Sequence, residues 1–279
     1  MQISSQNKDK LYGIFGIKMA LIGDIHCMPL PGTPRYKGNS MAEIIDRALL
    51  DAKAYIQGGM DGVIVENHGD IPFLHPDEIG HEIVAAMTAI TCAVKNEFGV
   101  PTGVNILANG AIQSLAVAKA SGAEFIRVNQ WVNAYIANEG LIEGKSGSSL
   151  RYRKAISAEE IAIFADVHVK HGSHSIVGDR SLTEQARDVE FYDADVAIAT
   201  GNRTGDSVPP EEISEIRNGT RLPVIAGSGI SVDNAEFLMR KLNGAIVGSS
   251  LKRDGVWWNE VQIDKVKALV EIVERLRAC

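Results

Sequence analysis

The chain has 279 residues, of which 45% are hydrophobic and 23% are charged, a composition typical of an ordinary globular protein. Its net charge of −7 leaves no basic excess to neutralise a phosphate backbone, so we expect no nucleic-acid partner. The three widely spaced cysteines fit reduced thiols rather than a disulfide framework or a zinc site. The first ten residues are polar and no apolar run approaches ~18 residues, so we expect a cytoplasmic protein with no integral membrane segment. Peripheral membrane association is left open.

Strand and helix patterns alternate along the whole chain. Residues 1–18 are expected to form an N-terminal arm and a cap over the bottom of a barrel, and residues 19–279 the barrel itself. The expected strands are 19–26, 62–66, 101–107, 124–129, 161–170, 196–200 and the apolar starts of 223–229 and 244–250. Eight strand–helix alternations predict a single (β/α)8 domain, the TIM-barrel fold of the α/β class.

Capping residues mark several of the expected helix starts. Ser40 with Glu43 has the spacing of a capping box, and so has Ser181 with Glu184. Ser231 is expected to cap the helix after the seventh strand. The remaining helices are expected near 77–98, 111–120, 209 onward and 264–277.

Two glycine turns follow the last two strands. In a (β/α)8 barrel, turns at these places present backbone N–H groups that hold phosphate, although they also serve simply as tight turns. We predict a phosphate site, with Lys252 and Arg253 as candidate helpers. Its members are Gly227, Ser228, Gly229, Gly248 and Ser249.

The ends of the other strands carry polar residues, where barrel enzymes place their chemistry. The candidate catalytic residues are Asp24, His26, Glu66, Arg127, Asp166, His168 and Lys170. The candidate substrate-binding residues are Asn67, Asn105, Asn129, Thr200 and Gly201. If 161–170 is one strand, alternation places Asp166, His168 and Lys170 on one side of it. Structural ion pairs within a wet barrel are the alternative for this trio.

Roles follow from residue type. Asp166, His168 or Glu66 would move protons, and Lys170 could stabilise negative charge or act as an amine nucleophile. Arg127 could neutralise either a substrate anion or a neighbouring aspartate.

No cofactor is predicted, but a divalent metal is an alternative. Its ligands would be Asp24, His26, Glu66, Asp166 and His168. We expect four other histidines to be solvated or to cap helices; they are His68, His75, His81 and His174. Trp257 and Trp258 are interpreted as packing or subunit contacts, and the long segment 131–154 as a lid over the ligand.

The chain resembles the BtpA/SgcQ family from about residue 15 to residue 275. The resemblance rests on Asp24-x-His26 and on an ordered set of segments: 28–32 (MPLPG), 59–67 (GMDGVIVEN), 69–73 (GDIPF), 103–105 (GVN), 125–129 (FIRVN), 165–171 (ADVHVKH), the TG pairs at 200 and 204, and 244–248 (GAIVG). It implies a barrel of the ribulose-phosphate-binding type. One departure is Ile25-His26-Cys27, where the family pattern has Val-His-Leu, which changes packing more than chemistry.

The family resemblance does not specify a reaction, so the candidate residues rest on their positions at strand ends. Some members are named for a role in photosystem I biogenesis, where the protein is described as membrane-peripheral, and others lie beside sugar-uptake genes. The leading hypothesis is an isomerase, epimerase or aldolase-like enzyme of carbohydrate metabolism that acts on a small phosphorylated metabolite. The alternatives are a non-catalytic assembly factor and a metal-dependent hydrolase. A homo-oligomer is expected because many barrels self-associate.

Overall fold

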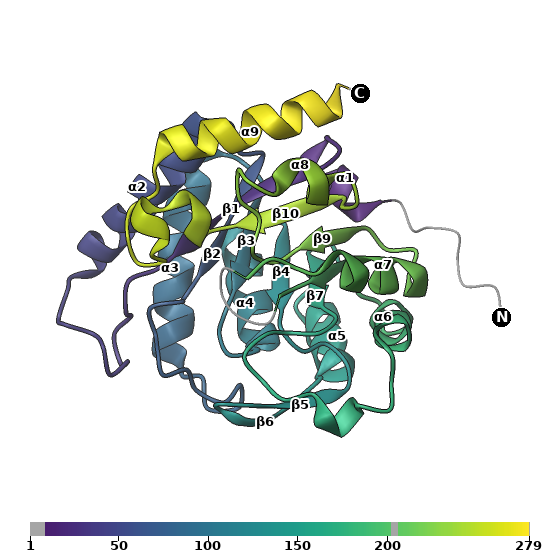
Figure 1. The fold of residues 1–279 in the computed structure, drawn as a ribbon. Helices are drawn as coiled ribbons and strands as arrows, with labels where there is room; N and C mark the ends of the chain where they lie inside the picture. Colours follow the sequence, from purple (N-terminus) through teal and green to yellow (C-terminus); the bar gives the residue numbers. More distant parts are fainter. Residues whose placement is uncertain (1–8, 202–205, 279) are drawn as a thin grey trace.

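Eight parallel strands close into a barrel in the computed structural model, which describes residues 9–201 and 206–278 (Figure 1). Residues 1–8 of the N-terminal arm and cap expected at 1–18, and residues 202–205 after the expected strand 196–200, therefore lie outside the described residues. The strand order around the barrel is β1-β10-β9-β8-β7-β4-β3-β2, which confirms the TIM barrel. The barrel strands are β1 (Ala20–His26), β2 (Gly62–Glu66), β3 (Thr102–Asn105), β4 (Phe125–Val128), β7 (Ala162–Asp166), β8 (Val196–Ala199), β9 (Val224–Ala226) and β10 (Gly244–Val247).

Helices surround the strands. They are α2 (Met41–Gly58), α3 (His81–Phe98), α4 (Ala111–Ser121), α5 (Ser146–Ala155), α6 (Leu182–Phe191), α7 (Pro210–Gly219), α8 (Ala235–Met239) and α9 (Ile263–Arg277), with short 3-10 turns at Ser175–Val177, Ser249–Leu251 and Arg253–Gly255. Ser40 and Glu43 form the predicted capping box, and the hydroxyl of Ser181 caps α6. The predicted cap at Ser231 is wrong, because α8 begins after Asn234, whose side chain accepts the Ser231 N–H instead.

The interior of the barrel is filled from below. Helix α1 (Lys10–Phe15) lies across the N-terminal ends of the strands, and its Leu11 is buried among Ile22, Ile64 and other inward-facing residues. The ring of Phe15 packs on Phe125, with centroids 5.9 Å apart. An apolar plug at this end leaves the polar chemistry to the opposite, C-terminal end of the strands.

The segment 131–154 is structured. A hairpin of β5 (Ala134–Ala137) and β6 (Gly140–Glu143) lies apart from the barrel strands and is followed directly by α5 (Figure 1). Gly140 has a φ of 103°, which an L side chain rarely adopts, so glycine permits the tight reversal. The hairpin is anchored to the loop after β7 by paired backbone hydrogen bonds between Ile136 and Ser173. Only the hairpin, and not the whole segment, borders the barrel mouth.

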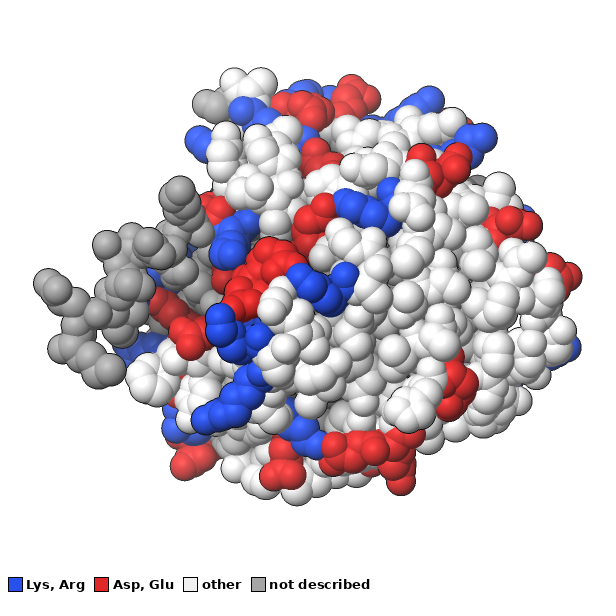
Figure 2. All heavy atoms as spheres, turned by 180° about the vertical axis from the view of Figure 1, so that it is seen from behind, with Lys and Arg blue, Asp and Glu red and all other residues white. Residues whose placement is uncertain are grey.

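Acidic and basic side chains are intermingled on the face that Figure 2 shows, without a continuous basic surface there. This agrees with the net charge of −7. Within 9–201 and 206–278, no helix has the length and hydropathy needed to cross a membrane.

Candidate functional site

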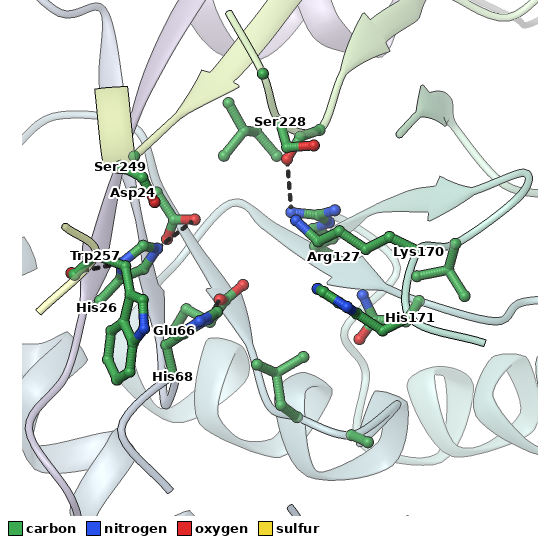
Figure 3. Close-up of a pocket in the computed structure, with 18 of the residues that line it drawn as sticks. Asp24, His26, Glu66, His68, Arg127, Lys170, His171, Ser228, Ser249 and Trp257 are labelled. Carbon is green, nitrogen blue, oxygen red and sulfur yellow. Dashed lines mark hydrogen bonds and ion pairs between the residues drawn. The ribbon is translucent and has the colours of Figure 1, made fainter. Parts of the chain in front are cut away.

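A cavity of about 640 Å³ opens at the C-terminal ends of the barrel strands. This volume lies within the range of ~300–1,000 Å³ for small-molecule sites. Polar side chains from β1, β2, β4 and the loop after β7 face the turns that follow β9 and β10 (Figure 3). Ala137, Asn138 and Glu139 of the hairpin form part of the rim.

One wall of the cavity carries two stacked histidines and two carboxylates. The Nδ1 of His26 lies 2.9 Å from the carbonyl oxygen of Trp257, and its Nε2 lies 3.2 Å from Oδ2 of Asp24. The Nδ1 of His68 lies 2.6 Å from Oε1 of Glu66. The two imidazole rings stack with centroids 4.5 Å apart, and the Trp257 ring meets His68 edge-on (Figure 3).

The Glu66–His68 pair has defined protonation states. Burial opposes ionisation of Glu66, but the hydrogen bond from His68 and the nearby charges bring its pKa below the usual range. Burial also lowers the pKa of His68, so its ring is neutral at neutral pH. His68 therefore donates its Nδ1 proton to the carboxylate and retains the lone pair on Nε2. The other Glu66 oxygen accepts a 2.6 Å hydrogen bond from Asn105.

Arg127 and Asp166 form a buried two-point ion pair. The Nε and Nη2 atoms of Arg127 each lie 3.0 Å from an oxygen of Asp166, and Nη1 donates to the carbonyl of Gly227. Thr200 and Asn129 also donate to Asp166. Burial would lower the pKa of Arg127, but the charge of Asp166 raises it above its ordinary value. Of the two roles predicted for Arg127, the structure shows the one in which it neutralises an aspartate.

Lys170 lies beside Arg127 and extends along the cavity wall (Figure 3). Burial, together with the adjacent charge of Arg127, lowers its pKa. No carboxylate of the described residues forms an ion pair with it. Its amine is therefore available to a ligand, either as an ammonium or as a nucleophile.

The two glycine turns complete the cavity. No described residue accepts a hydrogen bond from the N–H groups of Ser228, Gly229 or Ser249, and the buried hydroxyl of Ser228 has no partner there either. A Cβ added at Gly227 would lie 2.7 Å from Nη2 of Arg127, and one at Gly248 would lie 3.1 Å from Nε2 of His26. Glycine thus allows the backbone to approach these side chains closely.

Most of the predicted site residues do lie at the cavity. Those that line it are Asp24, His26, Glu66, Arg127, Asn129, Lys170, Gly227, Ser228, Gly229, Gly248 and Ser249. Others lie behind the residues that line the cavity. Asn67 donates a 2.9 Å hydrogen bond to Asp70, and Thr200 donates to Asp166, which in turn pairs with Arg127. Gly201 packs against the backbone of Asp206.

His168 lies away from the cavity, contrary to the strand alternation. Strand β7 ends at Asp166, and the chain bends over 167–170, so the period-two pattern does not continue. The ring of His168 stacks on His174, with centroids 3.7 Å apart. Burial and the neighbouring His174 lower the pKa of His168 to about 4. Neither His168 nor the Arg127-bound Asp166 is therefore placed for the metal set expected from sequence.

The expected role of Lys252 and Arg253 as helpers of the phosphate site is wrong. Lys252 is fully buried and pairs with Asp51 at 3.2 Å, and Arg253 lies near Glu260, so neither helps the glycine turns. Trp257 packs on His68, as expected of a packing residue, but it also lines the cavity, and its carbonyl oxygen accepts a hydrogen bond from Nδ1 of His26.

Sequence reasoning missed His68. The available signal was its position two residues after Glu66, directly beyond the end of β2. A bend after the strand returns the ring onto the carboxylate, and alternation within the strand could not show this.

The fold and the cavity together define a TIM barrel with a polar site at its C-terminal mouth. The chain belongs to the BtpA family, whose model matches residues 17–275, which confirms the resemblance. It is 39% identical over 263 residues to the photosystem I biogenesis protein BtpA of Synechocystis sp., and the aligned region covers 94% of this chain and 90% of that protein. It is 40% identical over 254 residues to a protein of Archaeoglobus fulgidus, with 91% of this chain and 98% of that protein covered.

Solved structures that are similar show the fold alone. Thiamine phosphate pyrophosphorylase from Pyrococcus furiosus superposes with a TM-score of 0.54 at 17% identity and covers 92% of this chain and 96% of that one. The 3-hexulose-6-phosphate synthase from Salmonella typhimurium gives a TM-score of 0.56 at 15% identity, with 92% and 99% covered.

Proposed function

We propose that this protein is an enzyme that binds a small phosphorylated metabolite in the cavity and rearranges its carbon skeleton or hydroxyl groups. The observation that carries the proposal is a group of donors at the cavity that have no partner among the described residues: the N–H groups of the turns, the Ser228 hydroxyl and Lys170. Donors of this kind around glycine turns fit a phosphate oxygen set. The names of the two structural neighbours, which refer to a thiamine phosphate and a hexulose 6-phosphate, support the same substrate class.

The remaining groups supply acid–base chemistry. His68 offers a neutral Nε2 lone pair as a base, held in place by Glu66. Lys170 can stabilise an enolate-like oxygen, or attack a carbonyl as a free amine because its pKa is lowered by burial. Proton transfer with oxyanion stabilisation is what isomerases, epimerases and aldolases of phosphorylated sugars need.

The test is a measurement of phosphate binding. Binding is detected as a change in the fluorescence of Trp257 in the cavity and, separately, by calorimetry. Inorganic phosphate and ribulose 5-phosphate should bind to the wild-type chain treated with EDTA. Lys170→Met should weaken binding by about 10–100-fold, the loss of one charge-assisted hydrogen bond. Lys119→Met, at an exposed lysine that pairs with Glu160, is the matched control and should leave binding unchanged. Equal affinity of both variants would contradict the proposal.

A second assay separates the two roles of Lys170. Borohydride added during turnover of a ketose or aldose phosphate should trap a covalent adduct on Lys170 if the enzyme forms a Schiff base. Turnover without an adduct would leave proton transfer by His68 as the mechanism.

A non-catalytic assembly role is the second candidate. It is supported by the name of the Synechocystis relative and by exposed apolar side chains such as Phe191 and Trp258, which are 74% and 64% exposed. These side chains would also serve a homo-oligomer. In this case Phe191→Ser should abolish the biological role in a deletion strain, whereas Lys170→Met should not.

A further inference from the structure

The histidine–carboxylate wall has the composition of a metal site. Donor atoms of His26, Glu66 and His68 lie within 4.8 Å of one another. A transition-metal ion with bonds of about 2.0–2.2 Å brings its ligand atoms to within about 4.4 Å of one another. Small side-chain rotations would therefore allow one ion to contact all three.

The orientation of His26 places Asp24 beside this group of donor atoms. The Trp257 carbonyl can only accept a hydrogen bond, so Nδ1 of His26 carries the proton. Nε2, the ring nitrogen left to bind a metal ion, lies 3.2 Å from Oδ2 of Asp24.

Asp24 provides an independent observation. The residue is 6% exposed, and its Oδ1 makes no hydrogen bond with any residue in the described part of the chain. A buried carboxylate oxygen without a partner is costly, and a metal ion is one group that would satisfy it.

Outer contacts of the kind found around metal ligands are already present. The Trp257 carbonyl fixes the ring of His26, and Asn105 fixes the carboxylate of Glu66 with a 2.6 Å hydrogen bond. Such contacts orient metal-binding histidines and carboxylates.

We propose that His26, Glu66 and His68, with Asp24 beside them, bind one divalent transition-metal ion of the zinc or manganese type. Two imidazoles with carboxylates favour these ions over magnesium or calcium, which prefer oxygen ligands alone. Binding requires the His68–Glu66 hydrogen bond to open, so that both side chains turn their lone pairs to the ion; in the metal-bound state His68 is a ligand and no longer the base of the proposed proton transfer. The site uses residues other than the phosphate-binding turns, and its test does not depend on the proposed substrate.

The experiment is equilibrium dialysis of the untagged full chain against zinc after treatment with EDTA and desalting, with the metal measured by mass spectrometry. We expect one tightly bound zinc per chain. His68→Ala and Asp24→Asn should each weaken binding at least tenfold, whereas His81→Ala, at an exposed histidine, should not. Uptake by His68→Ala equal to that of the wild type would overturn the proposal.

A spectroscopic measurement guards against variants that fail to fold. The cobalt-substituted wild-type protein should show the absorption of a nitrogen–oxygen ligand set. A thiolate charge-transfer band would place the ion on a cysteine and refute the proposed ligands. Phosphate binding is measured in EDTA and zinc binding without phosphate, so failure of one proposal is distinguishable from failure of the other.

Discussion

Removing the carboxylate of Asp166 should destabilise the fold far more than removing a surface acid. Its side chain is buried, and Arg127 beside it is 3% exposed. Asp166→Ala leaves a buried guanidinium whose remaining hydrogen bond goes to the carbonyl of Gly227. Breaking a buried pair from one side costs about 3–5 kcal/mol of unfolding free energy. Because Thr200 and Asn129 lose the same acceptor, we expect the upper end of this range.

Replacing both partners should remove most of that cost. In Arg127→Met combined with Asp166→Leu, no charge is left unpaired, so the double variant should lie within about 1–2 kcal/mol of the wild type. Glu160→Ala breaks the exposed pair with Lys119 and should cost at most about 1 kcal/mol. Urea unfolding followed by circular dichroism and tryptophan fluorescence measures all four chains. An Asp166→Ala midpoint equal to that of Glu160→Ala would show that Arg127 does not depend on this partner.

Two further predictions concern the loop after β7 and the barrel core. Burial and then His174 lower the pKa of His168 from about 6.5 to about 4, so the unfolded chain binds more protons between these values. This contribution is complete above pH 6.5 and lost as the pH falls toward 4, and because the ring is partly exposed it amounts to about 1–2 kcal/mol. His168→Asn should therefore flatten the loss of urea midpoint between pH 7 and 4.5, and an unchanged slope would contradict the assignment. Gly23→Ala places a Cβ 2.4 Å from the Tyr55 ring and should lower the free energy of unfolding by about 1–3 kcal/mol. In Gly13→Ala the added Cβ meets no atom within 4 Å, so this variant should raise the melting temperature slightly. Similar melting temperatures for the two variants would count against the packing argument.

The barrel was predictable because its strands and turns are local signals. Apolar β-branched runs that break on glycine mark β9 and β10, and the capping box at Ser40 marks the start of α2. The cap predicted at Ser231 was wrong because a short polar residue before a helix fits several turn geometries. Here Asn234, and not Ser231, occupies the N-cap position of α8.

The composition of the candidate site was only partly predictable, because strand alternation says nothing beyond the last residue of the strand. His168 and His68 both follow a strand by two residues, yet only His68 turns back onto the cavity. The difference arises from contacts outside the strands: the ring of Trp257, far away in sequence, packs on His68, while His174, six residues after His168, stacks on that ring. Strand alternation shows neither the distant contact of Trp257 with His68 nor the stacking of His174 on its near neighbour His168.

The polar side chains at and near the strand ends are of two kinds: those that pair with one another, and those with a buried polar atom that has no partner among the described residues. Arg127 with Asp166, and Lys252 with Asp51, form closed pairs whose charges are already compensated. The Ser228 hydroxyl and Oδ1 of Asp24 are buried without partners among the described residues. Each such atom costs about 1–3 kcal/mol. A donor left over near Lys170 favours an anion there, and an acceptor left over near His26 favours a cation. Opposite charges in one cavity are what a phosphorylated substrate held beside a metal ion would require, and this is why we expect the two ligands to bind more tightly together than either does alone.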